Sequence, residues 1–320
     1  MPNIITHGLF AKAVYDEISD HKLKEIIKEF PREYIIGSNG PDFLFFYKFF
    51  QKKYASVRQL GSKVHASHVN DFYDLALDLI QHEKDEVLKK AMTSYVAGHL
   101  CHWALDSRAH PYIFYKTGSY SGLSASMHHR FESMMDAMML MKLRHETIRT
   151  FKFYLLAKQS PYSAEAVANI YVPIIETIFH EKISAKEIKD ALDDWYKLQN
   201  WLYDPKGVKT RILKAYEQKA GHPWLFSGNV VPYKIDETYD VLNEKKEIWC
   251  HPTDETKVSH ESFMEIFERA KKDVLDILEH LNEKDTVLSL LGNASYDTQE
   301  SEPKEMKYFN LIYGDMYENL

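Results

Sequence analysis

Three histidines and one aspartate stand in a segment that otherwise has the residues of a buried helix, AGHLCHWALDSRAHPYIFY at 97–115. Each residue of a helix advances by about 100°, so His102, Asp106 and His110, spaced four apart, drift by only about 40° per step. His99 falls in the same arc. The four side chains therefore form one stripe, about 12 Å long from His102 to His110, which is too long to surround one metal ion but suits two adjacent ions.

A second pair of potential ligands follows in HHRFE, where His128 and Glu132 are also four residues apart. This spacing lets an imidazole nitrogen and a carboxylate oxygen converge on one ion. Imidazole and carboxylate ligands without a thiolate are typical of catalytic zinc, although other metals accept the same set. Further candidates lie upstream: His7, Asp42 in the turn GPDF, His65 and His68.

The elements that must position these residues are predicted to be helices almost throughout. Apolar residues recur at helical spacing over 7–30, 56–81, 85–110 and 124–148, and again near 162–180, 186–203, 207–219 and 260–283. Pro111 is expected to end the third helix, because proline lacks the amide hydrogen that a helix interior needs. We therefore predict an all-α fold, a multi-helix bundle.

Domain organisation is expected to be simple, with one domain over residues 1–320. The candidate ligands lie within about 1–140, and a helical remainder follows over about 150–320. The irregular stretch 221–254 is the best candidate for a boundary, but it is rich in large apolar residues, unlike a linker.

Composition excludes several classes. The net charge of −7 is spread along the chain, so there is no evident nucleic-acid-binding patch. The only cysteines, Cys101 and Cys250, give no disulfide framework. The start, MPNIITHGLF, lacks the features of a signal peptide, and no apolar run is long enough for a transmembrane segment. We expect a cytoplasmic protein of unknown oligomeric state.

The order of these motifs resembles the zinc-dependent phospholipases C, which include the bacterial phosphatidylcholine-hydrolysing enzymes and the catalytic domain of clostridial alpha-toxin. The fungal single-strand-specific zinc nucleases share that fold and metal cluster. The family pattern is an early His, an Asp in a turn, a helical His, His-x-x-x-Asp, another His and then His-x-x-x-Glu. Residues 1–140 carry the resemblance through His7, Asp42, His65, His102, Asp106, His110, His128 and Glu132.

The resemblance implies two zinc ions and a less certain third. Asp42, His65, His102 and Asp106 would hold the first ion. The second would lie among His110, His128 and Glu132. His7 and a bridging Asp106 would hold the third. Three neighbouring histidines are not assigned as ligands: His68, His99 and His129. They are expected to pack in the fold or to support the ligands.

The third site differs from the family pattern. In the secreted enzymes the mature chain begins with a tryptophan whose amine and carbonyl bind the third zinc, whereas this chain begins Met1-Pro2. A free Pro2 amine could substitute only after Met1 is removed. The chain after residue 260 is predicted to be helical, so no lipid-binding β-sandwich is expected.

Function follows from the same resemblance. A metal-activated water would attack phosphorus in a phosphodiester, such as a phospholipid, and Asp42 could act as general base. The alternatives are a nuclease or nucleotidase that uses the same cluster, and a metal-binding relative without catalytic activity. The acidic charge balance counts mildly against nucleic acid as a substrate.

Overall fold

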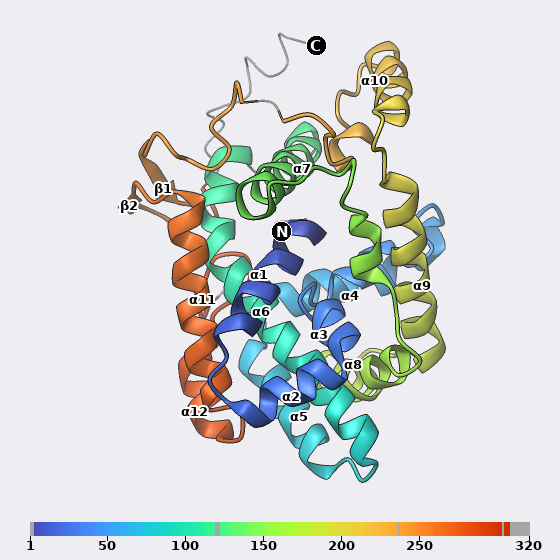
Figure 1. Cartoon of the computed structure of the whole chain (residues 1–320), viewed down its shortest axis with the longest axis vertical. Helices are drawn as coiled ribbons and strands as arrows, with labels where there is room; N and C mark the ends of the chain where they lie inside the picture. Colours follow the sequence, from blue (N-terminus) through green and yellow to red (C-terminus); the bar gives the residue numbers. More distant parts are fainter. Residues whose placement is uncertain (1–2, 119–121, 236, 303, 308–320) are drawn as a thin grey trace.

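The computed structural model describes residues 3–118, 122–235, 237–302 and 304–307. These residues form twelve α-helices, four short 3-10 helices and one small sheet (Figure 1). The α-helices are α1 (Ile4–Glu17), α2 (His21–Glu29), α3 (Pro31–Gly37), α4 (Ala55–Ala66), α5 (Val69–His82), α6 (Glu86–Thr117), α7 (Leu123–Arg144), α8 (Ser163–Phe179), α9 (Ala185–Leu202), α10 (Val208–Ala220), α11 (Phe263–Glu279) and α12 (Lys284–Leu291). The shorter elements are η1 (Asp42–Phe46), η2 (Lys52–Tyr54), η3 (Phe153–Ala157), η4 (Ser227–Asn229), β1 (Trp249–His251) and β2 (Asp254–Ser259). The predicted all-α fold class is confirmed.

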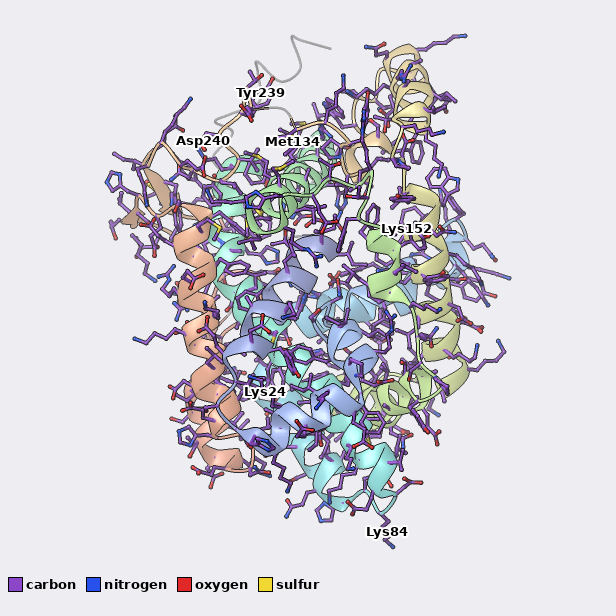
Figure 2. The ribbon with its side chains drawn as sticks, viewed as in Figure 1. Lys24, Lys84, Met134, Lys152, Tyr239 and Asp240 are labelled. Atoms are coloured by element: carbon purple, nitrogen blue, oxygen red, sulfur yellow. The ribbon has the colours of Figure 1, made fainter. Side chains whose placement is uncertain are left out.

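Helix α6 lies at the centre of the molecule. It contacts α1, α2, α3, α5, α7, α8, α11 and β1, several of which surround it in Figure 1. Its residues from Ser94 to Phe114 are buried on nearly every face, as expected for a helix with neighbours all around it. Side chains fill the spaces between the helices, whereas Lys84, in the connection from α5 to α6, points away from the body (Figure 2). The potential ligands of α6 are therefore core residues.

The prediction that this helix ends at Pro111 is wrong, because α6 continues to Thr117. A proline inside a helix costs about 3 kcal/mol, through a lost hydrogen bond and a clash with the preceding turn. Beyond it, Tyr112 and Ile113 are completely buried, and each such side chain contributes about 1.5–3 kcal/mol. Packing therefore outweighs the local preference, and the helix ends at Gly118, where φ is +80°.

Two other predicted helices are each divided in two. The segment 7–30 breaks before α2, where the Asp20 carboxylate accepts hydrogen bonds from the amides of Lys22 and Leu23 and so caps the new helix. The segment 56–81 breaks at His68, whose φ of +61° is left-handed and cannot continue a helix. Local capping and backbone geometry thus divide apolar patterns that appear continuous in the sequence.

The irregular stretch 221–254 packs onto the helices. Trp224, Leu242 and Trp249 are buried in the same core as the helices. The Tyr112 hydroxyl donates to the carbonyl of Val241 at 2.9 Å. Strands β1 and β2 pair antiparallel, a small hairpin that the sequence did not predict. A single domain over 1–320 stays a prediction.

None of the helices among the described residues combines the length and apolar character that crossing a membrane requires.

Helices α3 and α6 approach so closely that their backbones are in contact. A Cβ atom on Gly98 would lie 2.0 Å from the carbonyl oxygen of Tyr34, and one on Gly37 would lie 2.1 Å from the carbonyl oxygen of Tyr95. Only glycine fits at both positions. Because α3 leads directly into the turn that carries Asp42, this close packing sets the position of Asp42 over α6.

The variant Gly98→Ala should be less stable than the natural protein by about 1–3 kcal/mol or more, since backbone atoms cannot yield as a flexible side chain can. Gly8→Ala is the matched control. Its Cβ would meet the flexible side chain of Leu156 at 3.0 Å, and alanine gains about 1 kcal/mol in helix propensity. Denaturant unfolding measures both. Equal stability of the two variants would contradict this account of the α3–α6 contact.

Candidate metal centre

The structure brings the eight predicted ligands together in the core. They come from five elements: α1 supplies one, η1 one, α4 one, α6 three and α7 two. All eight are buried. Their potential ligand atoms form three groups, each with all atoms within 4.8 Å of one another: His7 with His102 and Asp106; Asp42 with His65 and His102; His110 with His128 and Glu132.

The carboxylate of Asp106 lies between the groups. Its Oδ1 is 3.1 Å from Nε2 of His7. Its Oδ2 is 3.2 Å from Nε2 of His102, 3.8 Å from Nε2 of His65 and 4.0 Å from Nε2 of His110. The two oxygens thus face different imidazoles, as a bridging carboxylate would require.

The group around Asp42 has the geometry of a single site. Oδ1 of Asp42 lies 3.3 Å from Nε2 of His65 and 3.8 Å from Nε2 of His102. The two imidazole nitrogens are 3.4 Å apart. Oδ2 of Asp106 lies beside the same two imidazoles, at 3.2 Å from His102 and 3.8 Å from His65.

The group formed by His110 of α6 with His128 and Glu132 of α7, the α7 group, lies one turn further along α6 than Asp106. Nε2 of His128 is 2.8 Å from Oε1 of Glu132, so the spacing of four residues brings their ligand atoms together as the sequence predicted. The ring of His110 lies 6.2 Å from that of His128, centre to centre. Three ligands with an open position are typical of catalytic zinc.

The imidazole rings are held by hydrogen bonds on the side away from the groups. Nδ1 of His65 donates to the carbonyl of Gly61 at 2.7 Å, and Nδ1 of His110 donates to the carbonyl of Tyr296 at 2.7 Å. These bonds fix the tautomer and leave Nε2 as the ligand atom.

His128 is held in the same way by a hydroxyl. The Thr117 hydroxyl donates to the carbonyl of Ile113 at 2.8 Å, so its oxygen accepts from Nδ1 of His128 at 3.1 Å. The last turn of α6, beyond Pro111, therefore supports a ligand on α7.

Helix α1 is anchored by a carboxylate from a distant helix. Asp136 of α7 accepts from the amides of Ile5 at 3.0 Å and Thr6 at 2.8 Å, and from the Thr6 hydroxyl at 2.6 Å. A carboxylate at the first turn of a helix accepts hydrogen bonds from the free amides and interacts favourably with the helix dipole. Asp136 thereby holds the next residue, His7, against Asp106.

The three histidines passed over lie elsewhere. Both nitrogens of His99 are engaged, Nδ1 with the Tyr73 hydroxyl at 2.8 Å and Nε2 with the Tyr171 hydroxyl at 2.9 Å, so neither is available to a metal. His68 is half exposed and pairs with Asp71 at 2.7 Å. His129 is 37% exposed, with Nδ1 at 3.9 Å from Glu132.

Some residues that shape the site were not found from the sequence. Tyr296 supplies the carbonyl for His110, and its amide donates to the carbonyl of His65 at 3.1 Å. Gly40 lies against His102, where a Cβ would be 2.1 Å from the ring. Its φ of +50° also favours glycine. The Gly40-Pro41 turn signal was visible in the sequence, but nothing local linked Tyr296 to the ligands.

The imidazoles of the centre differ in pKa. Burial would lower the pKa of His65, but Asp42, Asp297 and Asp106 outweigh it and raise that pKa to about 9. Burial lowers the pKa of His110 to about 4. Burial also lowers the pKa of His102, so among the imidazoles of the Asp42 group the raised pKa belongs to His65.

The carboxylates of the centre also differ. Burial raises the pKa of Asp42, although His65 opposes that shift. Burial would also raise the pKa of Glu132, but its cationic surroundings, His128 first among them, lower it to about 2. Glu132 is therefore ionised at neutral pH, as a ligand requires.

Unsatisfied polar atoms show that these residues fit a metal ion. Among the described residues, several buried atoms of the centre have no hydrogen-bond partner. They are both ring nitrogens of His7, Oδ1 of Asp42, Nδ1 of His102, both carboxylate oxygens of Asp106 and Nε2 of His110. Leaving a buried polar atom unpaired costs about 1–3 kcal/mol, and more for a charged group. Cations bound between these atoms would satisfy them.

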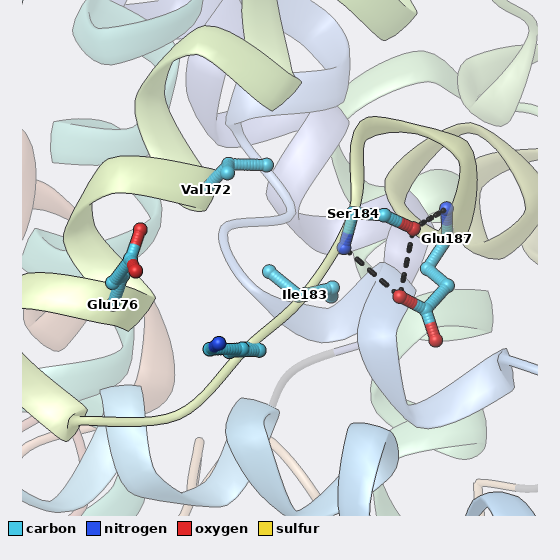
Figure 3. A pocket seen from close by; sticks show the side chains of 6 residues that line it. Val172, Glu176, Ile183, Ser184 and Glu187 are labelled. Carbon is cyan, nitrogen blue, oxygen red and sulfur yellow. Dashed lines mark hydrogen bonds between the residues drawn. The ribbon is translucent and has the colours of Figure 1, made fainter.

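A surface pocket of ≈330 Å³ lies apart from these ligands, between α8 and the start of α9 (Figure 3). Its polar groups already serve the fold, since the Ser184 amide donates to Glu187 Oε2 at 2.9 Å and the Glu187 amide donates to Ser184 Oγ at 3.2 Å. This is a capping box at the start of α9. The pocket therefore has a structural explanation.

Comparison with known proteins supports the same assignment. A family model described as zinc dependent phospholipase C matches residues 6–203, which is well over half of the chain and includes all eight predicted ligands. No curated protein and no solved structure matches the chain. The family match extends beyond residues 1–140, where the motifs lie. The chain belongs to the zinc-dependent phospholipase C family.

Proposed function

We propose that this protein is a zinc-dependent phosphodiester hydrolase that cleaves phospholipid as a phospholipase C does. One observation carries the proposal: the buried carboxylate of Asp106, with neither oxygen hydrogen-bonded, lies among imidazoles from α1, α4 and α6. Cations bound there would satisfy these atoms, and the arrangement occurs in a chain of a zinc-dependent phospholipase C family.

The ligand roles follow the groups. Asp42, His65, His102 and Asp106 hold one zinc ion. A second ion is held by His110, His128 and Glu132. Zinc ions held there would supply a water of lowered pKa and positive charge beside the phosphodiester. The hydrogen bonds from His65 and His110 to backbone carbonyls keep Nε2 of each ring aimed at its ion.

Asp42 is proposed to accept the proton of the attacking water. Burial raises the pKa of its carboxyl above the ordinary value, which makes it a better base than an exposed aspartate. Its position at the start of η1, held by the α3–α6 contact, fixes the carboxylate beside His65 and His102.

A third ion is proposed to bind weakly. In the described residues His7 and Asp106 face each other, with the His102 ring 4.4 Å from that of His7. Nε2 of His102 already faces the Asp42 group, which leaves the third position short of the usual three protein ligands. Met1 and Pro2, the residues that could complete it, lie outside the described residues.

Zinc uptake should show two pH dependences. The pKa of His65, about 9, means that an ion entering the Asp42 group displaces a proton at neutral pH. The affinity of that group should therefore fall about tenfold per unit as pH drops below this value. The α7 group should change little down to about pH 6, because the pKa of His110 is about 4 and that of Glu132 about 2. Competition with a chromophoric chelator measures both classes, and equal slopes would contradict the assignment.

Replacement of the bridging carboxylate tests the activity. Asp106→Asn should lower hydrolysis of a phosphocholine ester by more than about a hundredfold and reduce the bound zinc, since it removes a charge shared between sites. Asp285→Asn, in α12, is the matched control for an exposed aspartate and should change neither.

The same assays distinguish the substrate classes. Hydrolysis of phosphatidylcholine and of single-stranded DNA are compared for the natural protein. Cleavage of DNA alone would contradict the phospholipase proposal, and full activity of Asp106→Asn would contradict the mechanism.

A further inference from the structure

Helix α10 carries an apolar stripe on its exposed side. Val208, Ile212 and Tyr216 are 51%, 66% and 61% exposed. They are spaced four residues apart, so they lie along one side of the helix, with a drift of about 40° per step. Single exposed apolar residues are ordinary, but a continuous stripe is characteristic of an interaction surface. Trp201 and Leu225, on either side of α10 in the sequence, are 46% and 45% exposed.

The same helix is basic in an acidic protein. Lys209, Arg211, Lys214 and Lys219 lie within it, whereas the chain as a whole has a net charge of −7. Lys209 and Arg211 lie on opposite sides of the apolar stripe at about 100° and −60° from Val208. Such an arrangement is typical of helices that lie in a membrane interface.

The single acidic residue of α10 faces inward. Glu217 is buried, and its Oε1 accepts from the amides of Phe226 at 2.6 Å and Ser227 at 2.7 Å. Its other oxygen accepts from the Ser227 hydroxyl at 2.5 Å. The carboxylate is therefore used to hold the helix on the body, and the outward surface of α10 keeps its positive charge.

The segment that holds α10 on the body contacts α7, the helix that carries the predicted ligand Glu132. The segment that Glu217 holds packs on α7, where the Ser133 hydroxyl donates to the carbonyl of Gly228 at 2.7 Å. The Arg130 guanidinium lies 4.6 Å from the centre of the Trp224 ring. Ser133 is the neighbour of Glu132, a predicted ligand. In Figure 1, α10 projects from the body beyond the end of α9.

We propose that α10 docks the protein on a lipid surface that contains anionic lipids, with Val208, Ile212 and Tyr216 inserted among the headgroups. The positive charge of the helix complements an anionic lipid surface. The apolar stripe would contribute to binding that surface but not to binding a nucleic-acid backbone. The family match ends at residue 203, so family membership does not account for this helix. The inference rests on the proposed function in that docking would bring the metal centre to a lipid substrate.

Vesicle sedimentation tests the apolar stripe. The natural protein should bind vesicles of mixed phosphatidylcholine and phosphatidylserine, and the double variant Ile212→Gln with Tyr216→Gln should bind at least about tenfold more weakly. The matched control is Leu290→Gln with Val87→Gln. Those side chains are 40% and 44% exposed on α12 and α6, and their replacement should leave binding unchanged.

A second pair of variants tests the charge. Arg211→Glu with Lys219→Glu should weaken binding by about fivefold or more for each cation, and pure phosphatidylcholine vesicles should bind the natural protein more weakly than the mixture. Lys22→Glu with Lys28→Glu, on α2, makes the same change in net charge and should have little effect.

Failure of this inference is separable from failure of the proposed function. Hydrolysis of a water-soluble phosphocholine ester should be the same in the Ile212/Tyr216 double variant and the natural protein. Vesicle binding that does not depend on Ile212 and Tyr216 would overturn the docking role. Binding to single-stranded DNA that is lost with Arg211 and Lys219 alone would do the same. Vesicle binding by a protein without hydrolytic activity would support docking and contradict the proposed function.

Discussion

The carboxylate of Asp106 is the group on which the arrangement of the core depends. It is completely buried, and burial alone would raise its pKa, but His102, His110 and His7 outweigh that effect and hold the pKa well below the ordinary value. A buried charge is tolerated only where opposite charge and hydrogen-bonding groups converge on it. The fold must therefore bring imidazoles from several helices around one point, and a set of cations would balance the charge that those imidazoles leave unsatisfied.

The scaffold meets this requirement with contacts between distant parts of the chain. Helix α6 supplies Asp106 from the centre of the molecule, and the glycines of the α3–α6 crossing bring the Asp42 turn down onto it. Asp136 holds the first turn of α1, so that His7 faces the carboxylate. The carbonyl of Tyr296 orients His110 from near the end of the described chain. Each device positions one imidazole or carboxylate, and none of them binds an ion itself.

Contacts between residues of a single helix could be predicted from the sequence, because side chains four residues apart lie on the same face. That reasoning placed His128 beside Glu132 and His102 beside Asp106, and both pairs are close in the structure. Contacts between residues far apart in the sequence could not be predicted in this way. Nothing near Tyr296 in the sequence indicates that its carbonyl lies beside His110. The continuation of α6 past Pro111 likewise depends on packing around Tyr112 and Ile113, which local preference does not report.

We propose that the buried carboxylate of Asp106 is a zinc ligand, and diffraction from crystals grown with zinc would show this. Data collected on both sides of the zinc absorption edge locate the ions without assumption about their ligands. We expect one anomalous peak among Asp42, His65, His102 and Asp106, a second among His110, His128 and Glu132, and a weak or absent third beside His7. Zinc ions bound only at surface sites, with the Asp106 carboxylate not coordinated, would contradict the proposal.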